Sequence, residues 1–200
     1  MIKTIFCDLG NVIINVHNDI KIRNIKKFSS KSEKFIEEFL INSKARKDFD
    51  RGKISAIQFY KNLKDNLKLR LDFKQFKKIW CSYFSRRGDM ENLLKKLKKN
   101  YKLILLSNTD EIHFSHIKGK YKILDIFDKF VLSYEVGCTK PNPLIYLHAI
   151  KEAKTLPNEI LYIDDVYQFV MAAKLFGIKS IQYKNFQKLK EDLKRFKLKM

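Results

Sequence analysis

Short apolar runs alternate with longer amphipathic stretches along this chain. Five runs are rich in Ile, Leu, Val, Phe and Tyr and are too short to be helices: Thr4 to Cys7, Leu103 to Leu106, Phe130 to Leu132, Ile160 to Ile163 and Ser180 to Tyr183. Continuous apolar runs of this length are typical of strands buried on both faces. Helical signals lie between the later runs, including Asn142 before Pro143 as a helix start and Gly177 as a helix stop. The pattern predicts an α/β fold with a doubly wound (Rossmann-like) parallel sheet.

The segment between the first two runs has a different pattern. From Val16 to Arg87 there is no convincing strand, whereas Ser30 with Glu33 and Ser55 with Gln58 have the spacing of helix capping boxes. Half of the 16 Phe residues fall in this segment, as expected for the core of a helical bundle. Four further apolar residues recur at helical period along one face: Phe76, Ile79, Trp80 and Tyr83.

This arrangement predicts two domains. Residues 1–15 and 88–200 would form the α/β core domain, and residues 16–87 would form a small helical cap domain inserted after the first strand. The sequence contains no internal repeats and no linker rich in Gly, Ser or Pro. We therefore expect the cap to be attached to the core by short connections.

The composition excludes several classes of protein. With 200 residues, 45% hydrophobic and 13% aromatic, the chain can bury a core and is not disordered. Its longest apolar runs are too short to span a bilayer, and its first residues lack the features of a signal peptide. The three cysteines have no paired spacing, which disfavours a disulfide scaffold or a zinc site and fits a reducing compartment. We expect a cytoplasmic protein with no membrane partner.

The net charge of +20 raises the question of a nucleic-acid partner. The basic residues are 35 Lys and only 7 Arg, although Arg is the side chain best suited to bidentate base and phosphate contacts. Lys also recurs along the predicted solvent faces of most helices. We therefore interpret the charge as a solvated surface and expect no nucleic acid. A nucleic-acid role would instead predict tight binding with a steep dependence on salt.

Polar residues follow the predicted strands where each strand ends. Asp8 follows the first run, and Ser107 and Asn108 follow the second. The pair Asp164 and Asp165 follows the fourth. The third run leads through Ser133 into a loop, Gly137 to Pro141, that contains Lys140. Ligands of open α/β sheets bind outside the carboxyl ends of the strands. We therefore expect these side chains to meet at one edge of the sheet.

These residue types suit Mg²⁺ and a phosphoryl group. Several carboxylates at one edge repel each other unless a hard cation joins them, and oxygen ligands suit Mg²⁺. With the phosphate charge shielded, Asp8 can attack phosphorus as a nucleophile and form an aspartyl phosphate. The Ser107 hydroxyl, the amides at the following helix start and the ammonium of Lys140 can bind phosphoryl oxygens. Each of these residues taken alone also fits a helix cap or a solvated side chain. The interpretation as a magnesium and phosphoryl site depends on their order along the chain.

That order resembles the haloacid dehalogenase superfamily over nearly the whole chain. The four segments that resemble its motifs are Asp8 to Val12, Leu105 to Thr109, Gly137 to Pro143 and Tyr162 to Asp165. Within the cap, Arg51 to Ser55 also resembles a recurring segment of the superfamily. The first motif and the Asp pair resemble bacterial phosphatases that act on glucose 1-phosphate. The fourth motif is similar to the phosphatase domain of soluble epoxide hydrolase.

The resemblance implies a Mg²⁺-dependent phosphatase that acts on a small phosphorylated metabolite, such as a sugar phosphate. It implies that Asp8 is the nucleophile, that Asp165 and the carbonyl of Gly10 bind the metal with Asp8, and that Asp164 supports Lys140 or the metal shell. The residues that would hold the phosphoryl group are Ser107, Asn108 and Lys140.

The chain departs from the superfamily pattern at three positions. Most phosphatases of the superfamily carry a second Asp two residues after the nucleophile, which protonates the leaving group, and here that residue is Gly10. General acid catalysis is worth about 10²–10⁴-fold, so its loss predicts a preference for anomeric or acyl esters, whose leaving groups need less protonation. Val166 and Phe169 also stand where relatives often carry polar residues.

Four alternatives are weighed against the phosphatase. The serious one is a catalytically weak relative that binds a phosphorylated ligand or a partner protein, which the three departures favour. A dehalogenase would use Asp8 against carbon without a metal and would leave the Asp164–Asp165 pair unexplained. A phosphorylation receiver places its acidic pair at the first strand and has no room for a cap. The fourth is the nucleic-acid role that charge alone suggests.

Other residues with reactive side chains receive structural interpretations. We interpret His17, near the expected hinge to the cap, as a surface histidine, and we interpret His113 and His116 in the same way. Cys7 precedes the nucleophile, but strand alternation directs it to the opposite face, into packing. The oligomeric state is not predicted by the sequence.

Overall fold

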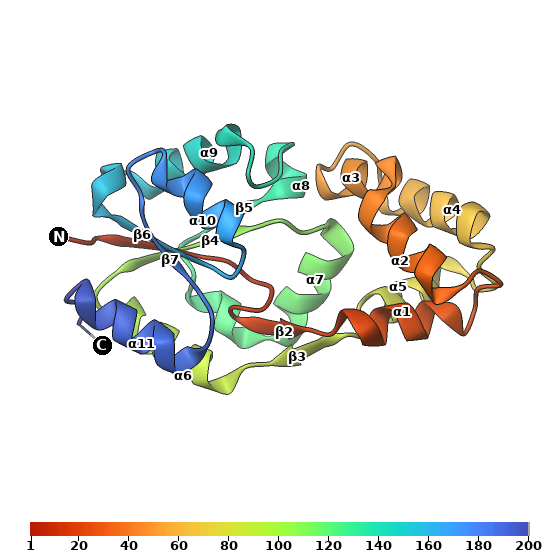
Figure 1. Ribbon diagram of the computed structural model, residues 1–200, viewed down its shortest axis with the longest axis horizontal. Helices are drawn as coiled ribbons and strands as arrows, with labels where there is room; N and C mark the ends of the chain where they lie inside the picture. Colours follow the sequence, from red (N-terminus) through yellow and green to blue (C-terminus); the bar gives the residue numbers. More distant parts are fainter. Residues whose placement is uncertain (200) are drawn as a thin grey trace.

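The five predicted strands form one parallel sheet. In the computed structural model, which describes residues 1–199, they are β1 (Thr4–Cys7), β4 (Lys102–Ser107), β5 (Lys129–Leu132), β6 (Ile160–Asp164) and β7 (Lys179–Gln182). Each lies within a residue of its apolar run. The spatial order is β5-β4-β1-β6-β7, and every neighbouring pair is parallel (Figure 1). The predicted doubly wound α/β fold is confirmed.

The central strand β1 has its carboxyl end in register with those of its two neighbours. Cys7 pairs with Leu105 of β4 on one side and with Ile163 of β6 on the other. The chain adds β4 and β5 on one side of β1 and then β6 and β7 on the other side, so the strand order reverses at β1. Ligands of open α/β sheets usually bind at such a point. The residues that follow β1, β4 and β6 consequently share one edge.

Helices cover both faces of the sheet (Figure 1). One face packs against α6 (Gly88–Lys98), α7 (Glu111–Lys120) and α11 (Phe186–Arg195), and the other against α9 (Pro143–Ala153) and α10 (Tyr167–Lys174). Shorter helical segments are α8 (Ser133–Val136), Lys122–Ile126 and Pro157–Glu159. The predicted start of α9 is confirmed, since the Asn142 side chain accepts from the Leu144 amide. No helix within residues 1–199 has both the length and the apolar character needed to cross a membrane.

Five helices form a separate bundle beyond the carboxyl ends of the strands (Figure 1). They are α1 (Asn18–Lys26), α2 (Glu33–Asn42), α3 (Lys44–Asp50), α4 (Ala56–Leu67) and α5 (Phe73–Trp80). The capping box of Ser55 and Gln58 is confirmed at the start of α4. The prediction for Ser30 is wrong, because the side chain of Ser32 accepts from the Phe35 amide and caps α2 instead.

Aromatic side chains fill the centre of this bundle. Phe59 stacks on Phe49 with ring centroids 4.3 Å apart and meets Trp80 edge-on at 5.1 Å. Phe76 and Trp80 of the predicted apolar face are both buried, and Tyr83 is buried as well although it lies beyond the end of α5. The expectation that the Phe residues build a packed core is confirmed.

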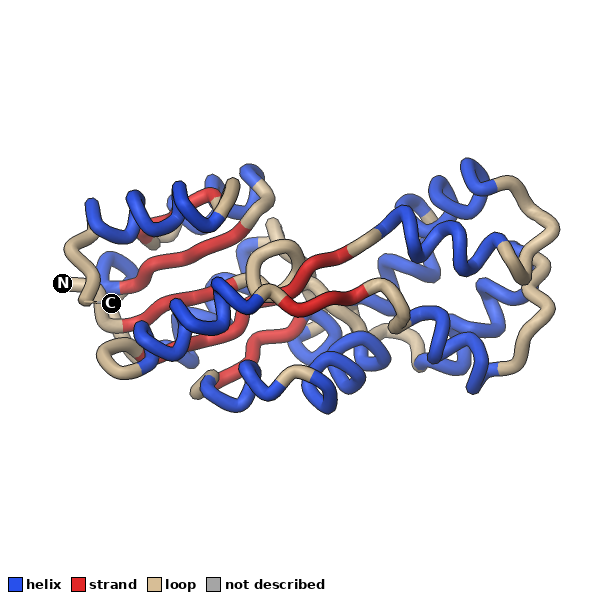
Figure 2. Tube along the Cα trace, turned by 90° about the horizontal axis from the view of Figure 1, so that it is seen from below, coloured by secondary structure: helices blue, strands red, loops and turns tan. Residues whose placement is uncertain are grey.

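The expectation that the segment from Val16 to Arg87 contains no strand is wrong. β2 (Ile14–Val16) and β3 (Phe84–Arg86) pair as an antiparallel ribbon that leads from the sheet to the helical bundle (Figure 2). A three-residue strand is too short to show alternation, and its partner lies about seventy residues away along the chain. β2 also lies across the predicted domain boundary between residues 15 and 16, which remains a prediction.

His17 belongs to this ribbon rather than to the open surface. It is only partly exposed, and its Nε2 lies 2.8 Å from the Ser85 hydroxyl. Asn15 Nδ2 donates to the same Ser85 oxygen at 3.1 Å. Hydrogen bonds of Asn15 and His17 to Ser85 therefore join the two antiparallel segments of the ribbon to each other.

We predict that Phe59→Ala lowers the free energy of unfolding by about 3–5 kcal/mol, because it removes a fully buried ring from the aromatic centre of the bundle. The matched control is Phe35→Ala on α2, whose ring is 41% exposed, and it should cost less than about 1 kcal/mol. Urea unfolding of both variants measures the difference. Equal losses would contradict the packing described for the bundle.

Candidate active site

The ammonium of Lys140 joins the ends of three strands. Its Nζ donates to Asp8 Oδ1 at 2.7 Å, to Asp164 Oδ2 at 2.6 Å and to the Leu106 carbonyl oxygen at 3.1 Å. Lys140 is only 3% exposed although it lies in a loop. Three of the predicted site residues, separated by up to 156 positions in the sequence, are therefore in direct contact.

The loop that carries Lys140 is held in place by Asn108. The Asn108 Oδ1 accepts from the Lys140 amide at 2.7 Å, and its Nδ2 donates to the Lys140 carbonyl at 3.0 Å. Both polar atoms of this side chain are thus used on the backbone of Lys140. Ser107 is buried, and the only hydrogen bond of its hydroxyl within residues 1–199 is a long one, 3.5 Å, to the Asn108 carbonyl. Its hydroxyl remains free to bind a ligand.

Asp165 completes a group of three carboxylates. Asp8, Asp164 and Asp165 each offer an oxygen, and these oxygens lie within 4.8 Å of one another. Asp165 Oδ2 accepts from Asn11 Nδ2 at 3.2 Å, and Asp164 Oδ1 accepts from the Val166 amide at 2.8 Å. The second oxygen of Asp164 also accepts from the hydroxyl of Tyr162. Neither Asn11 nor Tyr162 was among the predicted site residues.

The charges of this group are not balanced by Lys140 alone. Burial raises the pKa of Asp8 to about 7, Lys140 opposes that shift and Asp164 adds to it. Burial and Asp164 likewise raise the pKa of Asp165. Burial alone would lower the pKa of Lys140, but the carboxylates of Asp8 and Asp164 raise it overall, so the lysine keeps its charge. One ammonium faces three carboxylates.

The donor set therefore fits a hard divalent cation. Mg²⁺ prefers oxygen ligands and is commonly held by one or two carboxylates together with phosphate oxygens. The candidates are Asp8, Asp165 and the Gly10 carbonyl, with Asp164 nearby. Asp164 is already bonded to Lys140 and Tyr162, which fits a supporting role.

A cavity of about 190 Å³ lies next to these strand ends. Its lining from the core includes Gly10, Ser107 and Asn108, and its lining from the cap side includes Lys21 and Arg46. It therefore adjoins the predicted phosphoryl site and extends toward the helical bundle. A small leaving group bound to the phosphoryl group would occupy this space.

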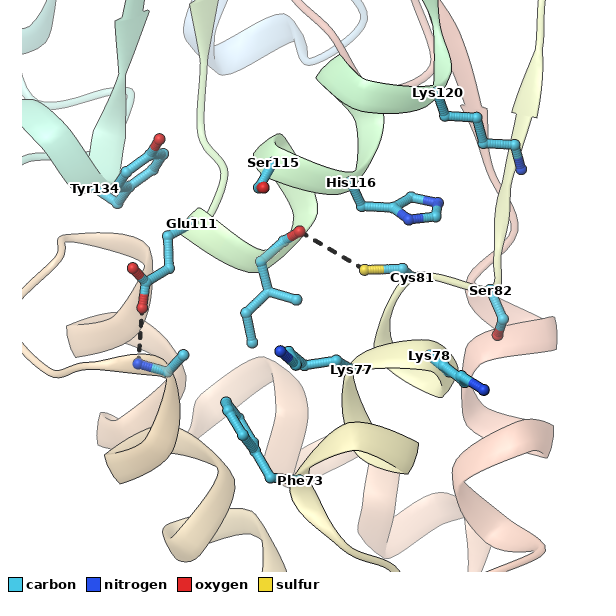
Figure 3. Close-up of a pocket in the computed structure, with 12 residues that line it drawn as sticks. Phe73, Lys77, Lys78, Cys81, Ser82, Glu111, Ser115, His116, Lys120 and Tyr134 are labelled. Carbon is cyan, nitrogen blue, oxygen red and sulfur yellow. Dashed lines mark hydrogen bonds between the residues drawn. The ribbon is translucent and has the colours of Figure 1, made fainter.

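A larger hollow of about 890 Å³ lies between α5 and α7, and none of the predicted site residues lines it (Figure 3). Cys81 Sγ, on its wall, donates to the Ile112 carbonyl at 3.7 Å. At its other end Glu111 Oε1 accepts from the Ala56 amide at 2.8 Å. These contacts join the cap to the core, and the hollow holds no group of carboxylates.

Asp110 is a further residue at the boundary between core and cap, and it was not predicted. Its Oδ1 accepts from the His113 amide at 2.9 Å and caps α7. Its Oδ2 accepts from Arg46 Nη1 at 2.8 Å and from Trp80 Nε1 at 3.3 Å, both from the cap. The expectation of a surface position for His113 is wrong, since this side chain is buried beside Asp110. The spacing Asp110-x-x-His113, directly after the second motif, was the available signal.

Gly52 brings the cap backbone against the core at a second point. An added Cβ at Gly52 would lie 2.0 Å from the Tyr134 carbonyl oxygen, and its φ of +65° is one that only glycine adopts freely. Gly52 lies within the predicted cap segment Arg51 to Ser55. The segment thus permits a close approach between α3 and α8 that any side chain would block.

The departures at Val166 and Phe169 have a visible structural effect. Val166 is exposed, and the centre of the Phe169 ring lies 5.1 Å from Lys140 Nζ. An aromatic face at this distance attracts the ammonium without adding an oxygen ligand. The shell around the carboxylates is therefore less polar on this side. Cys7 packs in the core on the other face of β1, as predicted.

We predict that Asp110→Asn lowers the free energy of unfolding by about 1–3 kcal/mol at neutral pH, because it removes the buried carboxylate that binds Arg46 and His113 and leaves Arg46 paired with Asp50 alone. Burial alone would raise the pKa of Asp110, but His113 and Arg46 hold it well below its ordinary value of 3.8. A depressed pKa in the folded state stabilises above the unfolded value, so the difference should persist down to that pH and shrink below it.

Urea unfolding across this pH range measures the difference between Asp110→Asn and the unmodified protein. The control is Asp125→Asn, an exposed carboxylate, which should change stability by less than about 0.5 kcal/mol. A difference that grew on acidification would have the wrong sign for this interaction.

Comparisons with known proteins place the chain in a family. The profile of the haloacid dehalogenase-like hydrolases matches residues 2–177. A D-ribitol-5-phosphate phosphatase of Bacteroides thetaiotaomicron is 29% identical over 96% of this chain and 97% of its own length. A crystal structure of a haloacid dehalogenase family enzyme from the same organism, in complex with magnesium and inorganic phosphate, superposes with a TM-score of 0.83 at 29% identity, covering 92% of this chain and 95% of that one. The structure of a predicted haloacid dehalogenase-like hydrolase from Porphyromonas gingivalis gives a TM-score of 0.85 at 26% identity, over 98% of both chains. The chain belongs to the haloacid dehalogenase-like hydrolases.

Proposed function

We propose that this protein is a Mg²⁺-dependent phosphatase that hydrolyses a small phosphorylated metabolite through an aspartyl phosphate on Asp8. One observation carries the proposal. Asp8, Asp164 and Asp165 present oxygens within 4.8 Å of one another around a buried Lys140, beside a cavity that can hold a leaving group. This arrangement supplies a nucleophile, a cation site and a positive charge at a single sheet edge.

The family match and the relatives support this reaction. The prediction of a phosphoric monoester hydrolase agrees with the family and with the phosphatase activity for which the Bacteroides relative is named. The related structure that contains magnesium and inorganic phosphate supports the expected cofactor. These observations favour phosphate transfer over the dehalogenase alternative, which leaves the Asp164–Asp165 pair without a role.

Asp8 is prepared for attack by its contact with Lys140. Oδ1 is bound by the ammonium, whereas Oδ2 makes no hydrogen bond to any of residues 1–199 and is left to form the bond to phosphorus. A bound Mg²⁺ would shield the phosphate charge from this carboxylate. Lys140 holds Asp8 in position and supplies positive charge toward the phosphoryl oxygens. Ser107 is proposed to bind one of those oxygens.

Asn108 is proposed to act through Lys140. Its amide holds the backbone of Lys140 from both sides, so removing it would displace the ammonium rather than delete a direct contact to phosphate. Asp164 is proposed to fix the other side of the same ammonium, and Asp165 to provide a partly exposed ligand for the cation.

The cavity supports a small, hydroxylated substrate. Its volume of about 190 Å³ limits the leaving group to a few carbon atoms, and Lys21, Arg46 and Asn18 place polar groups in its lining. Sugar and polyol phosphates have suitable size and polarity. A glucose 1-phosphate-like ester is the finer proposal from the sequence, and D-ribitol 5-phosphate, for which the relative is named, is the second compound to test.

We predict that Asp8→Asn abolishes turnover of phosphate esters while the protein stays folded, because the amide is not a nucleophile. The matched control is Asp65→Asn, an exposed carboxylate on α4, which should keep full activity. Phosphate release from an aryl phosphate and from sugar, polyol, nucleotide and acyl phosphates measures the effect, with Mg²⁺ and with a chelator in its place. Turnover should require the metal.

The same screen tests the alternative of a catalytically weak relative. Binding of phosphorylated compounds without phosphate release from any of them would favour a binding protein over an enzyme. Turnover that persists in Asp8→Asn or in the presence of the chelator would exclude the proposed mechanism.

A further inference from the structure

In most phosphatases of the superfamily, the second residue after the nucleophile carries the side chain that donates a proton, and in this chain that residue is a glycine. Gly10 stands two residues after Asp8, and it can offer only its backbone. When the bond between phosphorus and an alkyl oxygen breaks, the departing alkoxide needs a proton, and its delivery is worth about 10²–10⁴-fold in rate. A substitute donor would have to reach the cavity that Gly10 lines.

Three buried side chains form a hydrogen-bonded chain that ends at this cavity. Asp110 Oδ2 lies 2.7 Å from His113 Nδ1, and His113 Nε2 lies 2.7 Å from the hydroxyl of Tyr83. Tyr83 and His113 both line the 190 Å³ cavity, together with Gly10 and Ser107. Asp110 is fully buried and Tyr83 is 3% exposed, so bulk water does not compete for these contacts.

The acceptors around His113 determine where its protons lie. Nδ1 faces the carboxylate of Asp110, which accepts, and Nε2 lies 2.8 Å from the Trp80 carbonyl oxygen, which can only accept. Both ring nitrogens therefore carry protons in this arrangement. Burial lowers the pKa of His113 overall with a smaller contribution from Arg46, and Asp110 and the Trp80 carbonyl offset only part of that shift. The Tyr83 oxygen then accepts from Nε2, and its own proton is free to point elsewhere.

Tyr83 keeps that proton until a stronger base forms. Burial raises the pKa of Tyr83 well above its ordinary value, so the phenol is neutral in the resting enzyme. The ammonium of Lys21 lies 5.0 Å from the centre of its ring. An alkoxide leaving group is a far stronger base than a phenolate, so it would take the phenolic proton as it departs.

Building on the proposed phosphatase activity, we propose that Tyr83, oriented by His113 and Asp110, is the proton donor that replaces the missing side chain at Gly10. The bond between Asp8 and phosphorus forms while the bond to the leaving oxygen breaks. The electron pair of the broken bond stays on that oxygen, which takes the Tyr83 proton. Nε2 of His113 passes its proton to Tyr83, leaving a neutral ring whose Nδ1–H still donates to Asp110.

The second half of the reaction restores the starting state. Water attacks the phosphorus of the aspartyl phosphate, and the bond to Asp8 breaks. The proton that the water loses passes through Tyr83 to Nε2 of His113. One proton leaves the chain in the first step and one returns in the second, so Tyr83 and His113 end as they began.

The proposal reverses one expectation from the sequence. The predicted preference for anomeric or acyl esters assumed that no proton donor is present. With Tyr83 as donor, simple alkyl phosphates, including polyol phosphates, become suitable substrates. Lys21 is the competing candidate, because its ammonium also lines the cavity and burial lowers its pKa to about 8.

The test compares two substrates in the full-length Mg²⁺-loaded enzyme. An aryl phosphate with an acidic phenol as leaving group needs no proton, whereas an alkyl phosphate such as D-ribitol 5-phosphate does. We expect Tyr83→Phe to lower kcat/KM for the alkyl phosphate by about 10²–10⁴-fold. The fall for the aryl phosphate should be at least tenfold smaller. His113→Gln should show the same selectivity, because glutamine can hold Tyr83 but cannot pass on a proton.

Matched controls separate this effect from damage to the fold. Tyr60→Phe removes another buried hydroxyl of the cap, which donates to the Leu71 carbonyl away from the cavity, and it should leave the ratio of the two rates unchanged. Lys21→Met removes a polar group from the cavity wall, so it should raise KM for the polyol phosphate but leave the ratio of the two kcat values unchanged. Equal falls on both substrates in Tyr83→Phe, no fall on either, or a selective fall of kcat only in Lys21→Met would each overturn the proposal. If the unmodified protein releases no phosphate from either substrate, the proposed phosphatase function itself is refuted.

Discussion

The site depends on one buried cation. Lys140 lies between Asp8 and Asp164 with 3% of its surface exposed, and removing it would leave two buried carboxylates without the cation that they share. The same ammonium accounts for the shape of its surroundings. The loop after α8 brings it inward, Asn108 holds that loop, and the ends of β1, β4 and β6 supply the oxygens that it binds. One positive charge faces three carboxylates, and this excess of negative charge is why we propose this edge of the sheet as the site for Mg²⁺ and phosphate.

A second buried charge joins the cap to this site. Asp110 caps α7 of the core, binds Arg46 and Trp80 of the cap, and orients His113 toward Tyr83. A single carboxylate thus positions the cap over the cavity and also begins the proposed proton path. The ribbon of β2 and β3 carries the chain between the two parts and delivers Tyr83 to the cavity. Cap position and proton supply are therefore coupled through the same residues, so a change at Asp110 should affect both.

Local patterns in the sequence predicted much of the fold and the first set of site residues. All five apolar runs are strands within a residue, because strands buried on both faces must be apolar at nearly every position. Asp8, Ser107 and the Asp164–Asp165 pair could be assigned to one edge because each follows such a run and the carboxyl ends of parallel strands coincide. Errors occurred where a local signal was ambiguous. Ser30 and Ser32 offer similar caps, and the three-residue β2 and β3 show no period of their own.

What the sequence determined was the order of the strands along the chain and the chemistry at their ends, since both depend on neighbours within a few residues. The tertiary structure decided which side chains face each other. The contacts of Asp110 with Arg46 and of His113 with Tyr83 join residues 64 and 30 positions apart, and a histidine three residues after an aspartate looks the same on an open surface as in a core. The donor that compensates for Gly10 could not be found by looking near Gly10. Proton transfer requires contact in space, and the packing of the cap on the core creates that contact.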